Sequence, residues 1–184
     1  MEIEETNIIG VQLIHLEPHR DDRGVFVELF DREKFAALGI DQDFQQDAHS
    51  RSIKKGTVRG LHYQTDPHAQ SKLVRCSQGA VFDVVVDLRE NSTSYQQVFS
   101  TELSADKLTW LYLPFGLAHG FCTLIDHTQI DYKITGDYVP DLASGINWQD
   151  RTLAIDWPVS PDSAILSEQD KNLPELDNRD VLFS

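Results

Sequence analysis

Arg59-Gly60-Leu61-His62-Tyr63-Gln64, followed by Gln70-Ser71-Lys72-Leu73-Val74, combines the composition of β-strands with an arginine, a histidine and a lysine. Runs of Val, Leu and Tyr of this length are typical of strands. A titratable imidazole among such residues, rather than on a solvated loop, indicates a functional role, and proton transfer is a leading candidate for that role. The segment therefore predicts a β-rich fold that holds a site for acid–base chemistry.

Strand-like segments recur outward from this point in both directions. They are short, rich in Val, Ile, Phe and Tyr, and separated by Gly and Pro: Val11 to Leu16, Val25 to Phe30, Val58 to Gln64, Leu73 to Cys76, Ala80 to Leu88, Val98 to Leu103, Trp110 to Leu113 and Thr128 to Thr135. Only two segments have helical signals: Asp31 to Leu38, which begins with a capping Asp and stops at Gly39, and Ser167 to Asp170. This pattern predicts an all-β, double-sheet jelly roll with a few short helices.

Size and composition narrow the class of protein. The 184 residues fit one domain, expected to span 1–184, and the longest apolar runs are too short to cross a bilayer. Cys76 and Cys122 are isolated in apolar surroundings, which predicts buried free thiols in a cytoplasmic protein. The net charge of −14 argues against nucleic acid or an anionic membrane as a partner.

Alternation along the strands predicts which side chains share a face. Tyr132 falls on the same side as Ile130 and Ile134, so it is expected to point into the barrel. A buried tyrosine is more often a core residue than a catalyst. Strict alternation would send Arg59 to the face opposite His62, unless Gly60 marks a β-bulge, and the residues alone leave both arrangements open.

A metal centre is the first alternative for the two histidines. Cupin-type jelly rolls often bind metal through His-x-His and a final His after Pro-x-Gly, and the chain resembles the second half of that pattern in Pro114-x-Gly116-x-x-His119. The first half fails, because the residue two positions after His62 is Gln64, a poor ligand. We therefore expect no catalytic metal.

Motifs along nearly the whole chain match one family in order. They are Asp22-Arg23-Gly24-x-Phe26-x-Glu28, Arg59-Gly60-Leu61-His62-Tyr63-Gln64, Lys72-Leu73-Val74, Asp83-Val84-Val85-Val86-Asp87-Leu88-Arg89, His119-Gly120-Phe121, Tyr132-Lys133, Gly145-Ile146-x-Trp148-x-Asp150, Trp157-Pro158 and Leu166-Ser167-x-x-Asp170. On these motifs the chain resembles the dTDP-4-dehydrorhamnose 3,5-epimerase (RmlC-like) family of nucleotide-sugar epimerases. The resemblance implies a metal-free, cupin-type jelly roll, a homodimer with strands exchanged between subunits, and no cofactor.

The resemblance also implies a substrate and a set of roles. The substrate is a nucleoside-diphosphate 4-keto-6-deoxy sugar, whose hydrogens at C3 and C5 are acidified by the carbonyl. His62 would be the base and Tyr132 the acid that returns a proton to the opposite face. Asp170 would orient His62, and Lys72 would stabilise the enolate oxygen. The residues expected to bind the substrate are Arg23, Phe26, Glu28, Gln46, Arg59, His119 and Tyr138, with the two arginines on the diphosphate.

Each of these residues has a structural interpretation as well. Asp170 is suited to a capping box begun by Ser167, Lys72 to a solvated strand position, and Arg23 to a turn beside Gly24. Taken one at a time, these three favour the structural interpretation. The ordered set of motifs favours the catalytic one. Arg75 is expected to be an ordinary surface charge.

Two departures from the family pattern concern recognition rather than proton transfer. Ala48 stands where the family has an amide side chain, and Ala143 where it has an acidic one. Loss of hydrogen-bonding partners weakens discrimination, so the base and the sugar stay open. The alternatives are an epimerase acting at one centre, an enzyme for another nucleotide sugar such as a CDP-linked one, or a catalytically silent binder of sugar nucleotides. A metal-dependent cupin oxygenase is disfavoured by Gln64.

Overall fold

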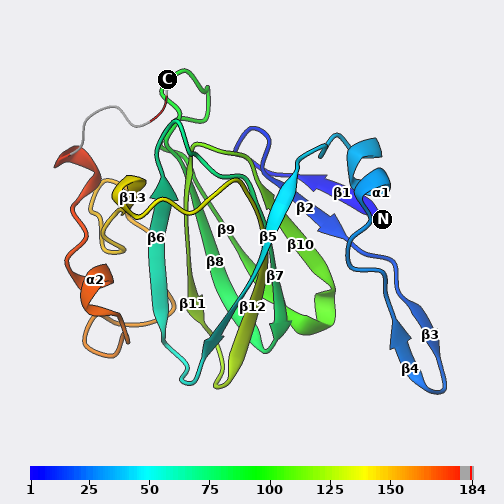
Figure 1. The fold of residues 1–184 in the computed structure, drawn as a ribbon. Helices are drawn as coiled ribbons and strands as arrows, with labels where there is room; N and C mark the ends of the chain where they lie inside the picture. Colours follow the sequence, from blue (N-terminus) through cyan, green and yellow to red (C-terminus); the bar gives the residue numbers. More distant parts are fainter. Residues whose placement is uncertain (179–182, 184) are drawn as a thin grey trace.

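Two antiparallel sheets and a projecting hairpin make up the computed structural model, which describes residues 1–178 and 183. The six-stranded sheet has the order β1 (Glu2–Glu5), β2 (Gln12–His15), β10 (Thr109–Leu113), β7 (Lys72–Gln78), β12 (Thr128–Thr135) and β5 (Phe44–Ser52). The five-stranded sheet has the order β13 (Ala143–Gly145), β6 (Val58–Gln64), β11 (Leu117–Thr123), β8 (Ala80–Asp87) and β9 (Val98–Ser104). The predicted all-β, double-sheet jelly roll is confirmed (Figure 1).

The remaining elements are short. Strands β3 (His19–Asp21) and β4 (Gly24–Phe26) form the hairpin, α1 spans Arg32–Ala37 and α2 spans Glu168–Lys171. Single 3-10 turns cover Ala105–Lys107, Pro140–Leu142 and Leu176–Asn178. Asp31 caps α1 by accepting hydrogen bonds from the backbone N–H groups of Glu33 and Lys34, as its sequence predicts. Among the residues that the structure describes, no helix is long and apolar enough to cross a membrane.

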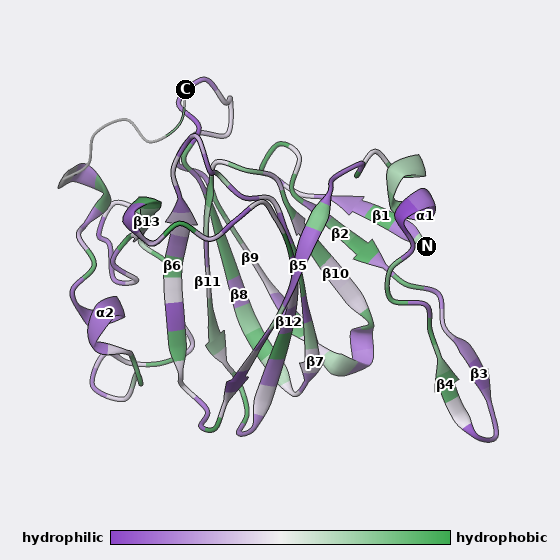
Figure 2. Cartoon of the chain, viewed as in Figure 1, coloured by the Kyte–Doolittle hydropathy of each residue, from purple (hydrophilic) through white to green (hydrophobic). Residues whose placement is uncertain are grey.

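The buried apolar side chains of the described residues form four clusters, of which two lie in layers on either face of the five-stranded sheet. The first lies between the sheets and includes Val74, Val85, Leu111, Phe121 and Ile130. The second covers the outer face of the five-stranded sheet, where the C-terminal segment packs through side chains such as those of Ile146, Leu153, Leu176 and Phe183. In Figure 2 the hydrophobic colouring follows the inner strands, whereas β3 is hydrophilic. The second layer matters for function, because it holds the segment that carries α2 beside β6 (Figure 1).

A β-bulge resolves the ambiguity about Arg59. The pairing of β6 with β11 shifts register between His119 and Phe121, opposite Gly60. Gly60 has φ +115°, and a Cβ at that position would lie 2.6 Å from the Cα of Gly120, so only glycine fits. Because the bulge inserts one residue, Arg59 and His62 line the same cavity instead of opposite faces.

Several strand predictions need correction, and the short strands β1, β3 and β13 were not predicted. The segment Val25 to Phe30 is not one strand, because β4 ends at Phe26 and the chain then turns towards α1. Strand β5 was missed because its sequence, Phe44–Ser52, is mostly polar, as befits the edge of a sheet. Strand β11 was missed because His119 and Gly120 interrupt its apolar pattern, although every residue of Leu117–Thr123 is buried.

Candidate active site

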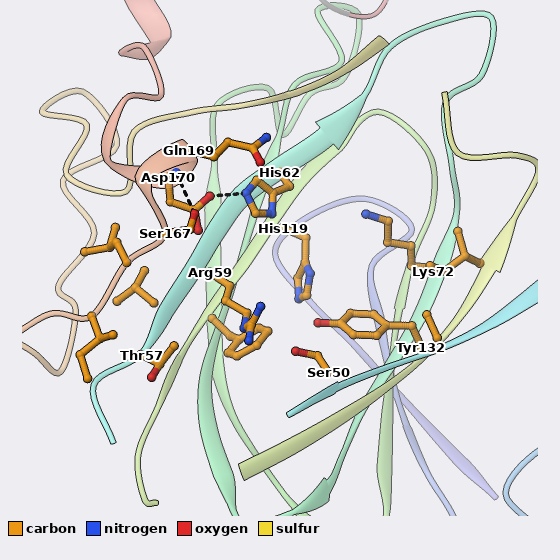
Figure 3. A pocket seen from close by; sticks show the side chains of 16 residues that line it. Ser50, Thr57, Arg59, His62, Lys72, His119, Tyr132, Ser167, Gln169 and Asp170 are labelled. Atoms are coloured by element: carbon orange, nitrogen blue, oxygen red, sulfur yellow. Dashed lines mark hydrogen bonds and ion pairs between the residues drawn. The ribbon is translucent and has the colours of Figure 1, made fainter. Parts of the chain in front are cut away.

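A cavity of about 610 Å³ opens between the two sheets. Its walls come from β5, β6, β7, β11, β12 and the segment that leads into α2 (Figure 3). Six of the residues predicted from the sequence line it together: Arg59, His62, Lys72, His119, Tyr132 and Asp170. Their side chains reach it from positions as much as 111 residues apart along the chain, so the fold assembles a set that the sequence scatters.

His62 and Asp170 form a hydrogen-bonded dyad. Nε2 of His62 lies 2.6 Å from Oδ1 of Asp170. The Asp170 side chain is only 5% exposed, whereas the His62 side chain is 42% exposed. With Nε2–H donating to the carboxylate, Nδ1 of His62 is left as a proton acceptor towards the cavity, and the carboxylate is placed to stabilise the imidazolium.

Helix capping positions this carboxylate instead of competing with it. The hydroxyl of Ser167 accepts a hydrogen bond from the backbone N–H of Asp170 at 3.0 Å, which starts α2. The side chain of Asp170 remains free to bind His62. The structural and the catalytic interpretations of Asp170 therefore both hold, one for its backbone and one for its carboxylate.

A second histidine–aspartate pair, which sequence reasoning missed, lies beside the first. Nε2 of His119 is 2.9 Å from Oδ1 and 3.0 Å from Oδ2 of Asp83, and Asp83 is completely buried. Burial raises the pKa of Asp83, while the charge and the hydrogen bond of His119 oppose that rise. A carboxylate within the apolar run of β8 was the available signal, because buried carboxylates are rare unless paired.

Lys72 is a cation without a protein counterion. It lies on β7 in the cavity wall, and its ammonium forms no hydrogen bond or ion pair within residues 1–178 and 183. Burial lowers the pKa of its ammonium to about 8. A negative oxygen brought in by a ligand would relieve this desolvation, so the site is prepared for developing negative charge.

Tyr132 points into the cavity from β12, as alternation predicts. Its ring meets the His119 ring edge-on, with 6.4 Å between centroids and 79° between planes. Burial raises the pKa of the phenol well above its usual value, and the negative charge of Asp83 raises it further. The hydroxyl therefore stays protonated, and it forms no hydrogen bond in the described part of the chain, as a proton donor to a ligand should.

Arg59 supplies a second cation, nearer the mouth. Its Nε donates to the Ser52 hydroxyl at 3.3 Å and its Nη2 to the Arg51 carbonyl at 3.4 Å, both long bonds to neutral acceptors. It has no carboxylate partner among the described residues. Its guanidinium can therefore bind an anionic group of a ligand.

Comparisons with known proteins agree with this geometry. The family model described as dTDP-4-dehydrorhamnose 3,5-epimerase matches residues 5–178. The chain belongs to this family. The dTDP-4-dehydrorhamnose 3,5-epimerase of Escherichia coli (strain K12) is 45% identical, over 96% of this chain and 95% of that protein. The predicted family and the predicted enzyme class, an isomerase, are confirmed.

Two further relatives bear on the substrate. The dTDP-6-deoxy-D-glucose-3,5-epimerase of Legionella pneumophila Philadelphia 1, solved in complex with dTDP-4-keto-L-rhamnose, superposes with a TM-score of 0.93 and 37% identity, covering 99% of this chain and 97% of that one. A dTDP-4-dehydrorhamnose 3-epimerase of Streptomyces niveus is 38% identical, over 94% of this chain and 82% of that protein. The chain thus belongs to enzymes that epimerise 4-keto-6-deoxy sugars at C3 and C5, and it also resembles one named for C3 alone.

Five predicted substrate residues do not line the cavity of their own chain: Arg23, Phe26, Glu28, Gln46 and Tyr138. Arg23 and Phe26 are on the projecting hairpin, where the Arg23 side chain is 90% exposed and Phe26 is 71% exposed. Arg23 forms an ion pair with Asp21 at 2.6 Å, and Glu28 pairs with Lys34. Within one chain these residues do not meet the proton-transfer set.

Gln46 binds the loop that follows β12, and Tyr138 lies on that loop. Gln46 donates to the carbonyl of Gly136, and Tyr138 is exposed two residues further on. Gln64 holds the same loop: its Nε2 donates to the carbonyls of Asp137, at 2.9 Å, and His68, and its Oε1 accepts from Val139 N–H at 2.8 Å. Gln64, at the position where cupins have a metal ligand, thus binds backbone groups of this loop.

The structure also describes the metal-ligating types of side chain, the two thiols and Arg75. In the part of the chain that the structure describes, no group of three or more His, Cys, Asp or Glu side chains is arranged to hold a metal. Cys76 and Cys122 are buried free thiols, as expected. Arg75 is not an ordinary surface charge: its side chain is 14% exposed, pairs with Asp131 at 3.1 Å and lies over the Trp110 ring.

Proposed function

We propose that this enzyme inverts C3, C5 or both centres of a dTDP-4-dehydro-6-deoxyglucose-type nucleotide sugar, with His62 as the base and Tyr132 as the acid. One observation carries the proposal. His62 comes from β6 of one sheet and Tyr132 from β12 of the other, and both line the same cavity. Inversion needs a base on one face of the sugar and an acid on the other, which two facing sheets can supply.

The first step breaks a C–H bond next to the carbonyl. Nδ1 of His62 takes the proton, and Asp170 stabilises the resulting imidazolium through the bond at 2.6 Å. The electron pair moves onto the C4 oxygen as an enolate. Lys72 stabilises that charge, and its unpaired ammonium in a half-buried position makes the interaction stronger than in water.

The second step forms a C–H bond on the opposite face. Tyr132 donates its proton to the carbanion carbon, which inverts the centre, and a phenolate remains until water reprotonates it. His62 returns its extra proton to water, so the cycle has no net consumption of protons. The raised pKa of Tyr132 keeps the donor loaded before the step, and a positioned acid of this kind contributes roughly 10²–10⁴-fold to the rate.

The partner of this chain is proposed to be a second copy of itself. The hairpin of β3 and β4 projects from the body, and it carries two predicted substrate residues that do not reach their own cavity (Figure 1). A homodimer in which each hairpin enters the other subunit's cavity would bring Arg23 to the diphosphate and Phe26 to the nucleotide. Exposure of Phe26 supports this, because a large exposed aromatic side chain is typical of a contact surface.

Subunit mixing tests this arrangement directly. His62→Ala and Arg23→Ala proteins, each of low activity, would be unfolded together and refolded as a mixture. If the hairpin acts on the other subunit, half of the dimers are hybrids with one intact site, so about a quarter of the wild-type activity returns. Activity no higher than the mean of the two parents would show that Arg23 acts within its own chain.

The number of inverted centres is tested by proton NMR of the wild-type enzyme with dTDP-4-keto-6-deoxyglucose in deuterium oxide. Loss of both the C3 and C5 signals identifies a two-centre epimerase, and loss of one a mono-epimerase. If neither signal is lost, another nucleotide such as a CDP-linked sugar, or a silent binder, replaces the proposal. The predicted cytoplasmic location and metal independence stay predictions. So does the single domain over 1–184, of which residues 179–182 and 184 lie outside the described residues.

A further inference from the structure

Ser50 lines the cavity next to Tyr132 and has no role so far. It lies on β5 opposite Ile130, while Tyr132 on β12 lies opposite Ala48. Ser50 is thus the diagonal cross-strand neighbour of Tyr132 on the same face, a position within reach of an aromatic side chain. Figure 3 shows its hydroxyl beside the hydroxyl end of Tyr132, with both directed into the cavity.

The Ser50 hydroxyl is buried and unpaired. Its Oγ has no hydrogen-bond partner among the described residues, although it is closed off from solvent. Such a group lowers the stability of the folded state, because its hydrogen bonds to water are lost and not replaced. Alanine would occupy the same space without this penalty, so packing does not account for the hydroxyl.

The phenol of Tyr132 would gain from a neighbouring hydrogen-bonding group. Its own hydroxyl has no hydrogen-bond partner in the described part of the chain, and proton donation would leave a phenolate in a buried place, close to the negative charge of Asp83. A donor beside the phenolate oxygen would lower the free energy of that state. Arg59 also faces the cavity, and its positive charge lowers the pKa of the phenol, opposing burial and Asp83, but its N–H groups are directed to the Ser52 hydroxyl and the Arg51 carbonyl.

We propose that Ser50 is a positioning residue for Tyr132, whose hydroxyl accepts the phenol O–H before proton transfer and donates to the phenolate after it. A serine hydroxyl can do both, because its O–H rotates and its oxygen carries two lone pairs. The inference rests on the proposed role of Tyr132 as the acid. Ser50 itself exchanges no proton: the phenol proton goes to carbon, and water restores it.

The inference separates two reactions that one NMR experiment follows. Abstraction and return of the proton by His62 exchanges hydrogen for deuterium without inverting the centre. Protonation by Tyr132 gives inversion. Ser50→Ala should therefore lower kcat for inversion roughly 10- to 100-fold, the range expected when an ionised group loses one hydrogen bond. Exchange without inversion should continue at nearly the wild-type rate, and KM should not change.

Thermal stability provides a second measurement, because Ser50→Ala is expected to raise it while lowering activity. Because Ser50→Ala removes an unpaired buried hydroxyl, its Tm should rise while its kcat falls. Ser50→Thr, which keeps the hydroxyl, should keep most of the inversion rate. Ser77→Ala is a matched control on β7: it removes a hydroxyl that donates to the Gln129 carbonyl at 3.4 Å, so Tm should fall slightly and activity stay unchanged.

Combination with Tyr132→Phe completes the test. Since Ser50 acts through the phenol, Ser50→Ala should cause no further loss of inversion in the Tyr132→Phe background. Losses that multiply, an equal fall in exchange and inversion, or wild-type kcat in Ser50→Ala would each overturn the inference. If the wild-type enzyme itself shows neither exchange nor inversion with this substrate, the proposed function fails first and the role of Ser50 falls with it.

Discussion

His62 and His119 are direct cross-strand partners on β6 and β11, and each imidazole is hydrogen-bonded to its own carboxylate. The two pairs differ in their environment. Asp170 reaches His62 from a helix at the cavity rim, whereas Asp83 is completely buried beneath His119. This difference leads to different expectations for the two aspartates.

Asp170→Asn should lower kcat by roughly 10²–10⁴-fold, because the amide neither stabilises the imidazolium nor fixes the productive tautomer of His62. The fold should be preserved, since the backbone N–H that Ser167 caps is unchanged. Steady-state kinetics and thermal unfolding measure the two effects. Ser167→Ala is the control: it should cost about 1 kcal/mol of helix stability and leave the dyad chemistry largely intact. A wild-type kcat for Asp170→Asn would remove Asp170 from the mechanism.

His119→Ala should be strongly destabilising, by about 3–5 kcal/mol, because it leaves the buried Asp83 without a partner. Asp83→Asn in the same chain should recover much of that loss, since a neutral amide is less costly to bury. Chemical denaturation of both single variants and the double variant measures the coupling. Strictly additive losses would mean that the two residues do not stabilise each other.

Lys72→Met should abolish most activity and raise stability. Burial holds the pKa of Lys72 at about 8 in the folded protein, below its ordinary value of 10.5. Between these two pH values Lys72 is protonated in the unfolded chain but not in the folded protein. The free energy of unfolding of the wild type therefore rises with pH across that range. The stabilisation by Lys72→Met should be largest below pH 8 and vanish near pH 10.5. For the wild type, a limb of the kcat profile should fall as pH rises through about 8; a flat profile from pH 7 to 9 would contradict the role of the ammonium.

Gln64→Leu should lower stability by about 2–4 kcal/mol and raise KM, because it leaves the backbone groups of the Tyr138 loop without their partner. Gln129→Leu is a matched control, since among the described residues that side-chain amide bonds only to Gln78, at an exposed position. Metal independence is tested separately, by metal analysis of purified wild-type protein. One tightly bound ion per chain that activity requires would overturn metal independence.

The sequence predicted most of the strands in which apolar residues alternate with polar ones or run together, with β11 as an exception because His119 and Gly120 interrupt its apolar pattern. β6 and β12 were predicted with their observed bounds, because Val, Leu, Ile or Tyr recurs along them between turn residues. β5 was not found, because an edge strand need not be apolar on either face. Hydrophobic patterning carries no information about such a strand, which is placed by backbone hydrogen bonds to β12.

The site was predicted less completely than the fold. His62 and Asp170 are 108 residues apart, and no local pattern pairs them; only the family motifs did. The roles of Asp83 and Ser50 were not predicted, because they depend on the register between strands. Each role can be recognised only once its strand is aligned with the neighbouring strand that carries His119 or Tyr132. Arg75 was misjudged for the same reason, since its partners Asp131 and Trp110 lie on adjacent strands.

The most direct test of the two-sided proton transfer is proton NMR in deuterium oxide on three enzymes, the wild type, His62→Ala and Tyr132→Phe, with dTDP-4-keto-6-deoxyglucose as substrate. The proposed roles predict that His62→Ala neither exchanges nor inverts, while Tyr132→Phe still exchanges a hydrogen next to the carbonyl but does not invert the centre. Exchange by His62→Ala at the wild-type rate, or full inversion by Tyr132→Phe, would contradict them.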